Sequence, residues 1–600
     1  MKTRSILLLS MAFLLSVPML AGEKYLHPTP QQLIATGDSI AIPSDYRTYV
    51  FEEGADIPAL KLLYSFLPYS AEKAGFGIYV GAKGDKSVKK FSRNIPQKAE
   101  GYYLKIDDNN IVIAGADRRG IYYGVQTLLQ LAENGKLPVV EITDYPDVPY
   151  RGVVEGFYGK PWSHQARLRQ LEFYGKNKMN VYIYGPKDDP YHRTPNWRKP
   201  YPEQEAAQMK ELVQAAADNN VIFYWAIHPG QDIKWNNEDR DSLLQKFEHM
   251  YQLGVRGFAV FFDDISGEGT KADKQAELLN YIDDNFIQTK HDVAPLVMCP
   301  TEYNKSWAKV EGGYLTTLGE KLNEDILVMW TGDKVVETID MKTLDFVNPL
   351  IRRKAFIWWN FPVSNYVQPH LLMGEVYGNG LDIKDDISAF VSNPMEYAEA
   401  SKIAIQSIAD YTWNMEQYDS HASWLQAIRD LMPENAGYLK TFVSHNSDLG
   451  PNGHNFQRME SEEIAPALDA LVKEFAATGK KDEQAWNTVY QECNNIIEAS
   501  DILLTTDENR PLVEEMTPWL YYFKLLGEYG CKVLETVEAR ANNDEAAFKR
   551  AYTHAKALKK LMEITDASSN RDHRQPGVKC GTKRLVPAFD TLLESGAVSK

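Results

Sequence analysis

The sequence predicts an α/β protein in which a (β/α)8 barrel follows a small α/β domain and precedes a helical bundle. Three observations lead to this prediction. The chain has 600 residues, too many for one ordinary domain. Short apolar runs alternate with helical sequence between residues 150 and 365. Beyond about residue 430, apolar residues recur with helical spacing.

The composition argues against some kinds of binding partner. Lys and Arg number 65 and Asp and Glu number 82, so the formal net charge is −17. Such an acidic chain is poorly suited to nucleic acid or to an anionic membrane, because both bind basic surfaces. With 44% hydrophobic and 24% charged residues, the composition is that of a folded globular protein.

Residues 1–21 are predicted to be a signal peptide. A basic start precedes an apolar run over residues 5–20, and the small residues Ala21 and Gly22 follow. The run is short for a transmembrane helix, although an uncleaved membrane anchor is the alternative. We therefore expect an exported chain, periplasmic or secreted, whose mature form is not stably inserted in a membrane.

Residues 22–147 are predicted to form the N-terminal α/β domain. An apolar strand is expected over residues 111–114, followed by a helix from near Arg119 whose apolar residues share one face. Pro146 and Pro149 suit neither a helix nor a central strand, so they mark the junction with the next domain.

Residues 148–430 are predicted to form the TIM barrel. Seven apolar runs, rich in Val, Ile and aromatic residues, imply parallel strands that are buried on both faces. An eighth strand is expected near residues 372–380 or 405–413, and a doubly wound sheet is the alternative. The seven runs are residues 153–159, 180–189, 221–230, 257–267, 295–303, 326–333 and 355–362.

Residues 431–600 are predicted to form a C-terminal helical domain. Leu468, Leu471 and Phe475 recur with the spacing of one helical face. Similar stripes run through residues 484–503, 515–540 and 545–565. The repeated stripes indicate a helical bundle.

Polar and aromatic residues follow the predicted barrel strands. In such a barrel, active sites lie at the carboxyl ends of the strands. Carboxylates, one Lys, amides and rings there suit a neutral polyhydroxylated ligand, since polar groups meet hydroxyls and flat rings meet the C–H face of a sugar. The residues are Glu155–Tyr158, Lys187–Asp189, His228, Asp263, Asp264, Glu302, Tyr303, Asp333 and Trp358–Asn360.

The most specific feature is the pair Asp263-Asp264 directly after the apolar run over residues 257–262. Neighbouring carboxylates repel when both are ionised, so one pKa is expected to rise and leave a proton donor beside an anion. Glycoside hydrolysis requires that division of roles. The alternative is that one Asp caps a helix while the other is solvated.

Adjacent residues do not easily present a nucleophile and an acid on opposite sides of one anomeric carbon. A 2-acetamido sugar removes this difficulty, because its own acetamido oxygen can attack the anomeric carbon and form an oxazoline. One Asp would then orient the acetamido N–H, and the other would protonate the leaving oxygen and later activate water. The configuration would be retained.

Long ordered motifs, among them FAVFFDDISGEGT at residues 258–270, resemble glycoside hydrolase family 84 and in particular its secreted bacterial members. This family consists of retaining β-N-acetylglucosaminidases. The resemblance implies a hexosaminidase of carbohydrate metabolism that removes terminal β-GlcNAc, including O-GlcNAc on Ser or Thr of proteins. The other matching segments are residues 151–168, 180–193, 297–307, 328–333, 357–366, 391–402 and 445–454.

The resemblance also implies roles by position. Asp263 would hold the acetamido N–H, Asp264 would be the general acid/base, and Tyr303 would hydrogen-bond the acetamido oxygen. Substrate hydroxyls would meet Gly156, through its backbone, and Lys187, Asn360 and Asn393. The N-acetyl pocket would be lined by Tyr158, Cys299, Thr331 and Trp358.

Asn365 departs from the family pattern, which has Asp at the position that grips the 4- and 6-hydroxyls. A neutral amide gives weaker hydrogen bonds than a carboxylate, so we expect weaker sugar binding with the chemistry intact. Two alternatives to the exo-acting enzyme remain at this point. One is a hyaluronidase-type glycan hydrolase, and the other is a catalytically impaired GlcNAc-binding protein.

The predicted chemistry needs no metal and no cofactor, and the sequence contains none of the common nucleotide or metal motifs. His445 and His454, in a Gly- and Asn-rich segment, are predicted to be structural. The cysteines are expected to be mostly packing residues: Cys299, Cys493, Cys531 and Cys580.

Overall fold

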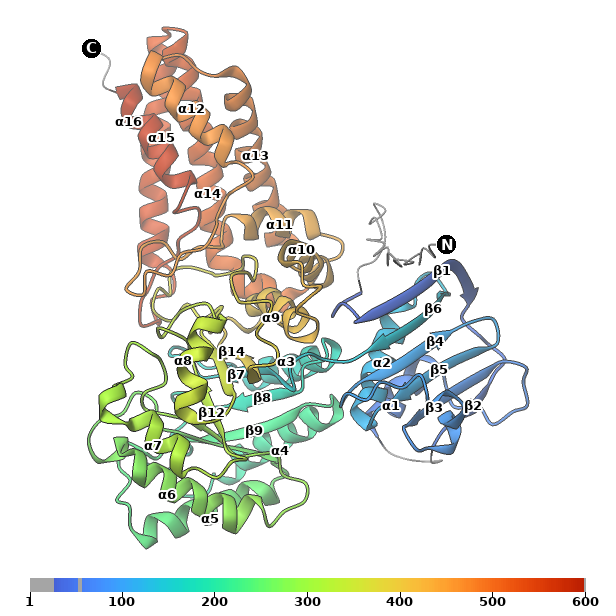
Figure 1. The fold of residues 1–600 in the computed structure, drawn as a ribbon. Helices are drawn as coiled ribbons and strands as arrows, with labels where there is room; N and C mark the ends of the chain where they lie inside the picture. Colours follow the sequence, from blue (N-terminus) through green and yellow to red (C-terminus); the bar gives the residue numbers. More distant parts are fainter. Residues whose placement is uncertain (1–25, 52–56, 598–600) are drawn as a thin grey trace, which may run out of the picture.

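The computed structural model describes residues 26–51 and 57–597, so the predicted signal peptide lies outside the described residues. Three parts follow one another along the chain: a small sheet domain, a barrel and a group of long helices (Figure 1). The fold class predicted from the sequence is therefore confirmed. The domain limits given above stay predictions.

The N-terminal part is a six-stranded mixed sheet in the order β1-β6-β4-β5-β3-β2. The predicted strand is β5, and the predicted helix is α2, which packs on strands β3, β4 and β5. The Asp117 carboxylate caps α2 by accepting the Gly120 N–H at 2.9 Å. The elements are β1 Gln32–Ala41, β2 Arg47–Tyr49, α1 Pro58–Phe66, β3 Gly77–Ala82, β4 Tyr102–Ile106, β5 Asn110–Gly115, α2 Arg118–Leu131 and β6 Lys136–Asp144.

Eight parallel strands close into a barrel, with β14 pairing β7 to complete the ring. Six of the seven predicted runs contain a barrel strand, and the first, residues 153–159, overlaps the end of β7. The strands are β7 Tyr150–Glu155, β8 Val181–Tyr184, β9 Ile222–Ile227, β10 Gly257–Phe261, β11 Val297–Cys299, β12 Leu327–Trp330, β13 Ala355–Trp359 and β14 Ile387–Ser392. The helices between the strands are α3 His164–Lys176, α4 Glu203–Asp218, α5 Asn237–Gln252, α6 Ala272–Ile282, α7 Tyr314–Lys321 and α8 Met341–Ile351.

The predicted position of the eighth strand is wrong. Strand β14 spans Ile387–Ser392, whereas residues 372–380 are irregular and residues 405–413 belong to helix α9, Ala398–Trp413. Every residue of α9 is buried, including a polar face whose side chains are paired within the protein, namely Glu399, Lys402, Gln406 and Asp410. The β13–β14 link, residues 360–386, contains no helix, so the strand–helix alternation used for the prediction stops there.

Beyond the barrel the chain is helical, as predicted. Leu468, Leu471 and Phe475 of the predicted stripe are buried in α12. The remaining helices are α10 Ser420–Leu431, α11 Ala436–Ser444, α12 Ala465–Thr478, α13 Glu483–Thr505, α14 Arg510–Ala541, α15 Glu545–Ser568 and α16 Leu585–Ala597.

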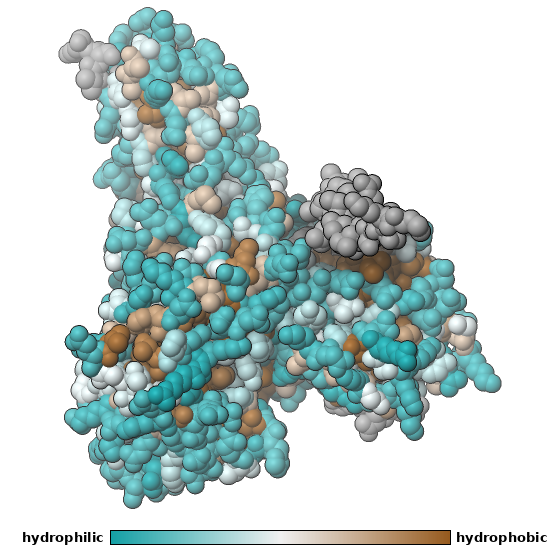
Figure 2. Space-filling model, viewed as in Figure 1, coloured by the Kyte–Doolittle hydropathy of each residue, from teal (hydrophilic) through white to brown (hydrophobic). Residues whose placement is uncertain are grey.

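The surface and the cysteines fit this globular picture. Hydrophilic residues predominate on the face shown in Figure 2, and hydrophobic residues form small patches. Across residues 26–51 and 57–597, no helix combines the length and the apolar character needed to cross a membrane. All four cysteines are free and buried, as expected of packing residues.

Candidate active site

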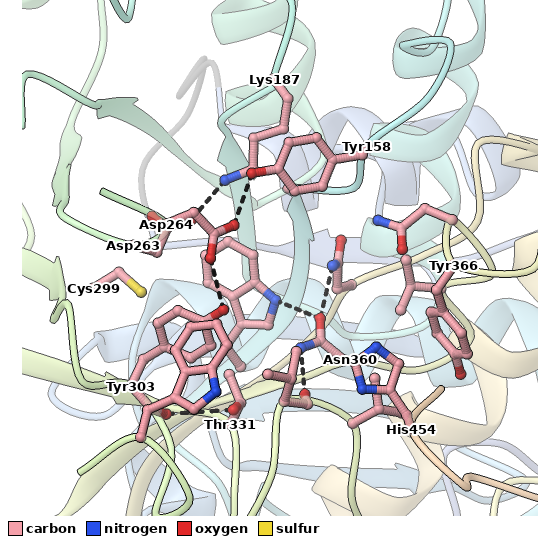
Figure 3. Close-up of a pocket in the computed structure, with 18 residues that line it drawn as sticks. Tyr158, Lys187, Asp263, Asp264, Cys299, Tyr303, Thr331, Asn360, Tyr366 and His454 are labelled. Atoms are coloured by element: carbon pink, nitrogen blue, oxygen red, sulfur yellow. Dashed lines mark hydrogen bonds and ion pairs between the residues drawn. The ribbon is translucent and has the colours of Figure 1, made fainter. Parts of the chain in front are cut away.

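A cavity of about 250 Å³ opens at the carboxyl ends of the barrel strands (Figure 3). Each residue singled out above as catalytic or substrate-binding lines it. These residues lie at the carboxyl ends of seven different strands or in the segments that follow them, so closing the barrel brings them together. They are Gly156, Tyr158, Lys187, Asp263, Asp264, Cys299, Tyr303, Thr331, Trp358, Asn360, Asn365 and Asn393.

Asp263 and Asp264 occupy opposite environments although they are adjacent. Asp263 is 5% exposed and lies inside the barrel mouth, whereas Asp264 is exposed. The backbone of Asp264 has φ 53°, in the left-handed region that few residues other than glycine adopt. Such strained residues concentrate at functional sites, where the fold holds them in place. Here the turn separates the two carboxylates.

Asp263 is held as an anion. Lys187 Nζ donates to its Oδ2 at 2.7 Å, and His228 Nε2 lies 2.8 Å from its backbone oxygen and 3.4 Å from its Oδ1. Burial alone would raise the pKa of Asp263, but Lys187 and His228 outweigh burial and hold it well below its usual range. In turn, burial would lower the pKa of Lys187, and the charge of Asp263 raises it. Apart from the 3.4 Å contact with His228, Asp263 Oδ1 has no hydrogen-bond partner among the described residues.

Asp264 accepts one phenol hydrogen bond on each carboxylate oxygen. Tyr303 donates to Oδ1 at 2.9 Å and Tyr158 donates to Oδ2 at 2.7 Å. Burial and the charges of the aspartates raise the pKa of Tyr303, and burial is also the main cause that raises the pKa of Tyr158 to about 12. Both phenols therefore stay protonated and serve as donors. The upward pKa shift expected for one member of the aspartate pair stays a prediction.

Trp358 forms one wall of the cavity. A Cβ atom on Gly156 would lie 2.4 Å from the Trp358 ring, so only glycine allows this approach. Cys299 and Thr331 lie nearby, and burial raises the pKa of the Cys299 thiol, which stays neutral. Thr331 Oγ1 is turned to the backbone and donates to the Lys334 carbonyl at 3.0 Å. This part of the cavity is mostly apolar and fits a methyl group.

Two amide side chains, those of Asn360 and Asn393, line another part of the cavity. Asn360 Oδ1 accepts from Trp358 Nε1 at 3.0 Å and from Asn393 Nδ2 at 2.8 Å. Asn393 is buried and its Oδ1 has no partner, so it can accept a hydrogen bond from a sugar hydroxyl. Asn365 is partly buried, and its side chain takes part in none of the hydrogen bonds found within the described ranges.

Several residues predicted at the barrel rim do not line the cavity. Glu155 is 1% exposed and forms an ion pair with Arg167 at 2.7 Å, so it braces the barrel. Asp189 accepts hydrogen bonds from Tyr184 and Tyr201, both at 2.8 Å. His228 acts on the site through Asp263 and is a positioning residue. The others that stand back from the cavity are Phe157, Asp188, Glu302, Asp333 and Trp359.

Six further residues line the cavity that the sequence did not assign to the site: Trp307, Val335, Val336, Val363, Tyr366 and His454. His454, predicted to be structural, lies on the cavity wall with its ring 4.7 Å from the ring of Tyr366. A lone His in a polar loop carries no local signal for this position. His445, by contrast, is buried and bonded to Ser461 and Glu492, which supports a structural role.

Loop 448–458 carries His454 to the cavity from beyond the barrel. The Asp448 carboxylate closes the loop by accepting the N–H groups of Gly450 and Arg458, at 2.7 and 2.5 Å. The Asn452 side chain links the two arms of the loop, because its Nδ2 donates to the Gly450 and Phe456 carbonyls at 2.9 and 2.7 Å. These bonds fix the loop before any ligand arrives.

Three family models match the chain. Residues 151–444 match the model described as beta-N-acetylglucosaminidase, and residues 460–593 match the post-catalytic domain of bacterial GH84, that is, glycoside hydrolase family 84. Residues 23–145 match domain 2 of glycosyl hydrolase family 20. The matches follow the three parts of the fold in order.

The protein O-GlcNAcases of Rattus norvegicus and Mus musculus are each 35% identical to the chain over 272 residues, 44% of this chain and 29% of theirs. The match thus spans under a third of the length of these curated relatives. Among solved structures, an O-GlcNAc hydrolase mutant of Thermobaculum terrenum is 27% identical, with 75% of this chain and 95% of that one covered and a TM-score of 0.65.

The solved structure of CpGH84B is 31% identical to the chain and aligns over 95% of this chain and all of that one, with a TM-score of 0.86. CpGH84D aligns over 96% and 100%, with 27% identity and a TM-score of 0.88. Since the likeness covers all three parts and includes the catalytic and post-catalytic family models, this chain belongs to glycoside hydrolase family 84.

Proposed function

We propose that the chain is a retaining, exo-acting β-N-acetylglucosaminidase that removes terminal β-linked GlcNAc, including O-GlcNAc on Ser or Thr, by substrate-assisted catalysis. The observation that carries this proposal is the division between the two aspartates. Asp263 is buried and forms an ion pair with Lys187, which keeps it ionised, so it is unsuited to donate a proton. Asp264 is exposed at the cavity mouth, where a leaving group would pass.

In the first step, the Asp263 carboxylate accepts the acetamido N–H of the substrate and stabilises the positive charge that develops there. The acetamido oxygen attacks the anomeric carbon, and the glycosidic bond breaks. Asp264 gives a proton to the departing oxygen. The product of this step is a protonated oxazoline whose N–H stays hydrogen-bonded to the Asp263 carboxylate, and Asp264 is left as a carboxylate.

In the second step, the Asp264 carboxylate takes a proton from water as the water attacks the anomeric carbon and opens the oxazoline. The phenols of Tyr303 and Tyr158 stabilise the ionised form of Asp264 between the steps. Two attacks on the same carbon, each with inversion, give retention.

The shape of the cavity supports an exo action. Its volume of about 250 Å³ suits one sugar ring, and Tyr366 and His454 form a wall beyond the amides. A terminal GlcNAc fits a pocket of this size better than the interior of a polymer does. The acidic net charge of −17 is also poorly matched to the polyanionic chain that a hyaluronidase cleaves.

We also propose that the mature chain acts outside the cytoplasm, on glycans or glycoproteins that end in β-GlcNAc. Support comes from the basic start and apolar run of residues 1–21. N-terminal sequencing of the protein recovered from cell fractions tests this proposal. A cytoplasmic product that keeps residues 1–21 would contradict it.

The activity is tested with a chromogenic aryl β-N-acetylglucosaminide and with the Asp264→Asn and Asp263→Ala variants. We expect turnover by the wild type and a loss of about 10²–10⁴-fold in each variant. Azide should restore turnover in Asp264→Asn and give the β-glycosyl azide, because the nucleophile replaces the activated water. Azide should not rescue Asp263→Ala, in which the oxazoline forms poorly.

A wild-type protein that binds N-acetylglucosamine without hydrolysing the aryl glycoside would contradict the enzyme proposal. The GlcNAc-binding alternative would then explain the cavity. A Glu302→Gln variant serves as a matched control, because Glu302 is a carboxylate one residue before Tyr303 and does not line the cavity.

A further inference from the structure

Trp307 stands at the cavity mouth with 44% of its surface exposed. A large aromatic side chain usually gains stability by burial, so an exposed ring beside a catalytic cavity calls for a reason. The indole packs against the ring of Tyr303, with ring centroids 4.8 Å apart and an angle of 59° between the planes. Its other face is free to meet a ligand.

The backbone that carries Trp307 is fixed. Asn304 is fully buried, and its Oδ1 accepts the Trp307 N–H at 3.1 Å. The Ser306 N–H donates to the Asp333 carbonyl at 3.0 Å, which ties the turn to the loop after β12. Little conformational freedom is therefore left to lose when a ligand reaches the ring, and such preorganisation favours binding.

The position of Asp264 identifies the side of the cavity from which the aglycone leaves. A general acid must reach the glycosidic oxygen, so the aglycone lies beyond Asp264 and outside the buried Asp263. Tyr303, which bonds Asp264, carries Trp307 on its ring, and Tyr158, which bonds the other oxygen of Asp264, is 36% exposed. Aromatic rings thus border the path of the aglycone.

We propose that Trp307 is a specificity-determining residue that stacks on a ring-shaped aglycone, a second pyranose. Terminal GlcNAc on a glycan is then cleaved in preference to GlcNAc on the Ser of a flexible peptide. The inference rests on the proposed function and narrows its substrate class. A flat indole covers the C–H face of a pyranose, whereas a single Ser side chain leaves most of the indole in water.

Steady-state kinetics on three substrates test this assignment: the β-1,4-linked GlcNAc disaccharide, methyl β-N-acetylglucosaminide, and a short peptide with O-GlcNAc on Ser. All three release an alcohol that needs a proton from the acid, so differences among them report contacts with the aglycone. The variants are Trp307→Ala and Trp307→Phe. Val310→Ala is the control, because Val310 is an exposed apolar residue nearby that does not line the cavity.

We expect the wild type to prefer the disaccharide, and Trp307→Ala to lower kcat/KM for the disaccharide about tenfold, mainly through KM. Its kcat/KM for the methyl glycoside should change less than about twofold. Trp307→Phe should keep part of the preference, and Val310→Ala should keep all of it. Thermal melting of each variant checks that the fold is intact.

Two results would overturn the assignment while leaving the proposed function in place. One is an equal loss on all three substrates in Trp307→Ala, which would mean that the ring only shields the bond between Tyr303 and Asp264. The other is a wild type that shows no preference for the disaccharide. A wild type that cleaves none of the three, nor the aryl glycoside, would overturn the proposed function and this inference together.

Discussion

At the residue scale, the buried pair of Lys187 and Asp263 governs the site. Lys187 Nζ lies 2.7 Å from Asp263 Oδ2, and their side chains are 8% and 7% exposed. A buried ion pair costs desolvation energy, and removal of one partner leaves an uncompensated charge. In the proposed mechanism, the pair supplies a carboxylate that stays ionised beside the acetamido group of the substrate.

Lys187→Met should therefore raise the pKa of Asp263, because burial remains and the main opposing charge is gone. The ionised form is the active one, so the acid limb of kcat/KM should move to higher pH and the plateau should fall by about 10²-fold or more. Full pH profiles of the two proteins measure this change. Lys160→Met is the control, because Lys160 is 71% exposed on the barrel surface. An unmoved acid limb would contradict the role of Lys187.

Asn365→Asp tests the departure from the family pattern. Charge-assisted hydrogen bonds contribute ~1.5–3 kcal/mol against ~1 kcal/mol for neutral ones, so we expect about tenfold tighter binding of N-acetylglucosamine. The value of kcat should stay within about twofold. Inhibition constants of the two proteins measure the effect. Equal constants would show that the neutral amide already serves the sugar as well as a carboxylate does.

The individual site residues were predictable to different degrees. Asp263 and Lys187 lie two and three residues beyond the ends of the apolar strands β10 and β8, and a strand end in a barrel has a known place. Trp307 and His454 lie on loops whose course depends on contacts with distant segments. No pattern in the local sequence marks them as cavity residues.

At the element scale, seven barrel strands were predictable. Both faces of a barrel strand are buried, so each of these strands appears in the sequence as a continuous apolar run. Strand β14 escaped prediction because residues 360–386 before it contain no helix, so the strand–helix alternation gave no signal for its position. Loop 448–458 is a different kind of element, since its order comes from side-chain bonds rather than from a ladder of backbone bonds.

Loosening this loop should weaken sugar binding without changing the chemistry. Asn452→Ala removes the bonds that cross the loop, so KM should rise about threefold to tenfold at unchanged kcat. His454→Ala should have a similar effect. Since both act through one contact, the double variant should be little worse than either single variant. Additive effects would show that the loop and His454 act separately.

At the scale of the whole molecule, one buried acid ties stability to pH. Glu460 is 2% exposed and accepts the N–H of Lys583 at 2.8 Å, next to the loop that carries His454. Burial raises its pKa from 4.5 to about 8. The folded chain therefore keeps a proton on Glu460 over a pH range in which the unfolded chain has lost it.

The stability contributed by this proton is complete below pH 4.5 and is lost as the pH rises toward 8. Glu460→Gln keeps a neutral acceptor at every pH. We expect both proteins to melt at similar temperatures at pH 4.5 and the variant to melt higher at pH 8, by about 5 °C. Calorimetry at both pH values measures this, with Glu462→Gln as the exposed control. A difference that is constant with pH would contradict the shift.

The position of loop 448–458 bears on how the parts of this protein can be exchanged during evolution. The two family models that describe the catalytic and post-catalytic regions end at residue 444 and begin at residue 460, so His454 belongs to neither. A recombination event that exchanged only the catalytic or only the post-catalytic region at these borders would place the junction in the wall of the sugar cavity. The barrel and the helices that follow it should therefore pass from one gene to another as a single unit.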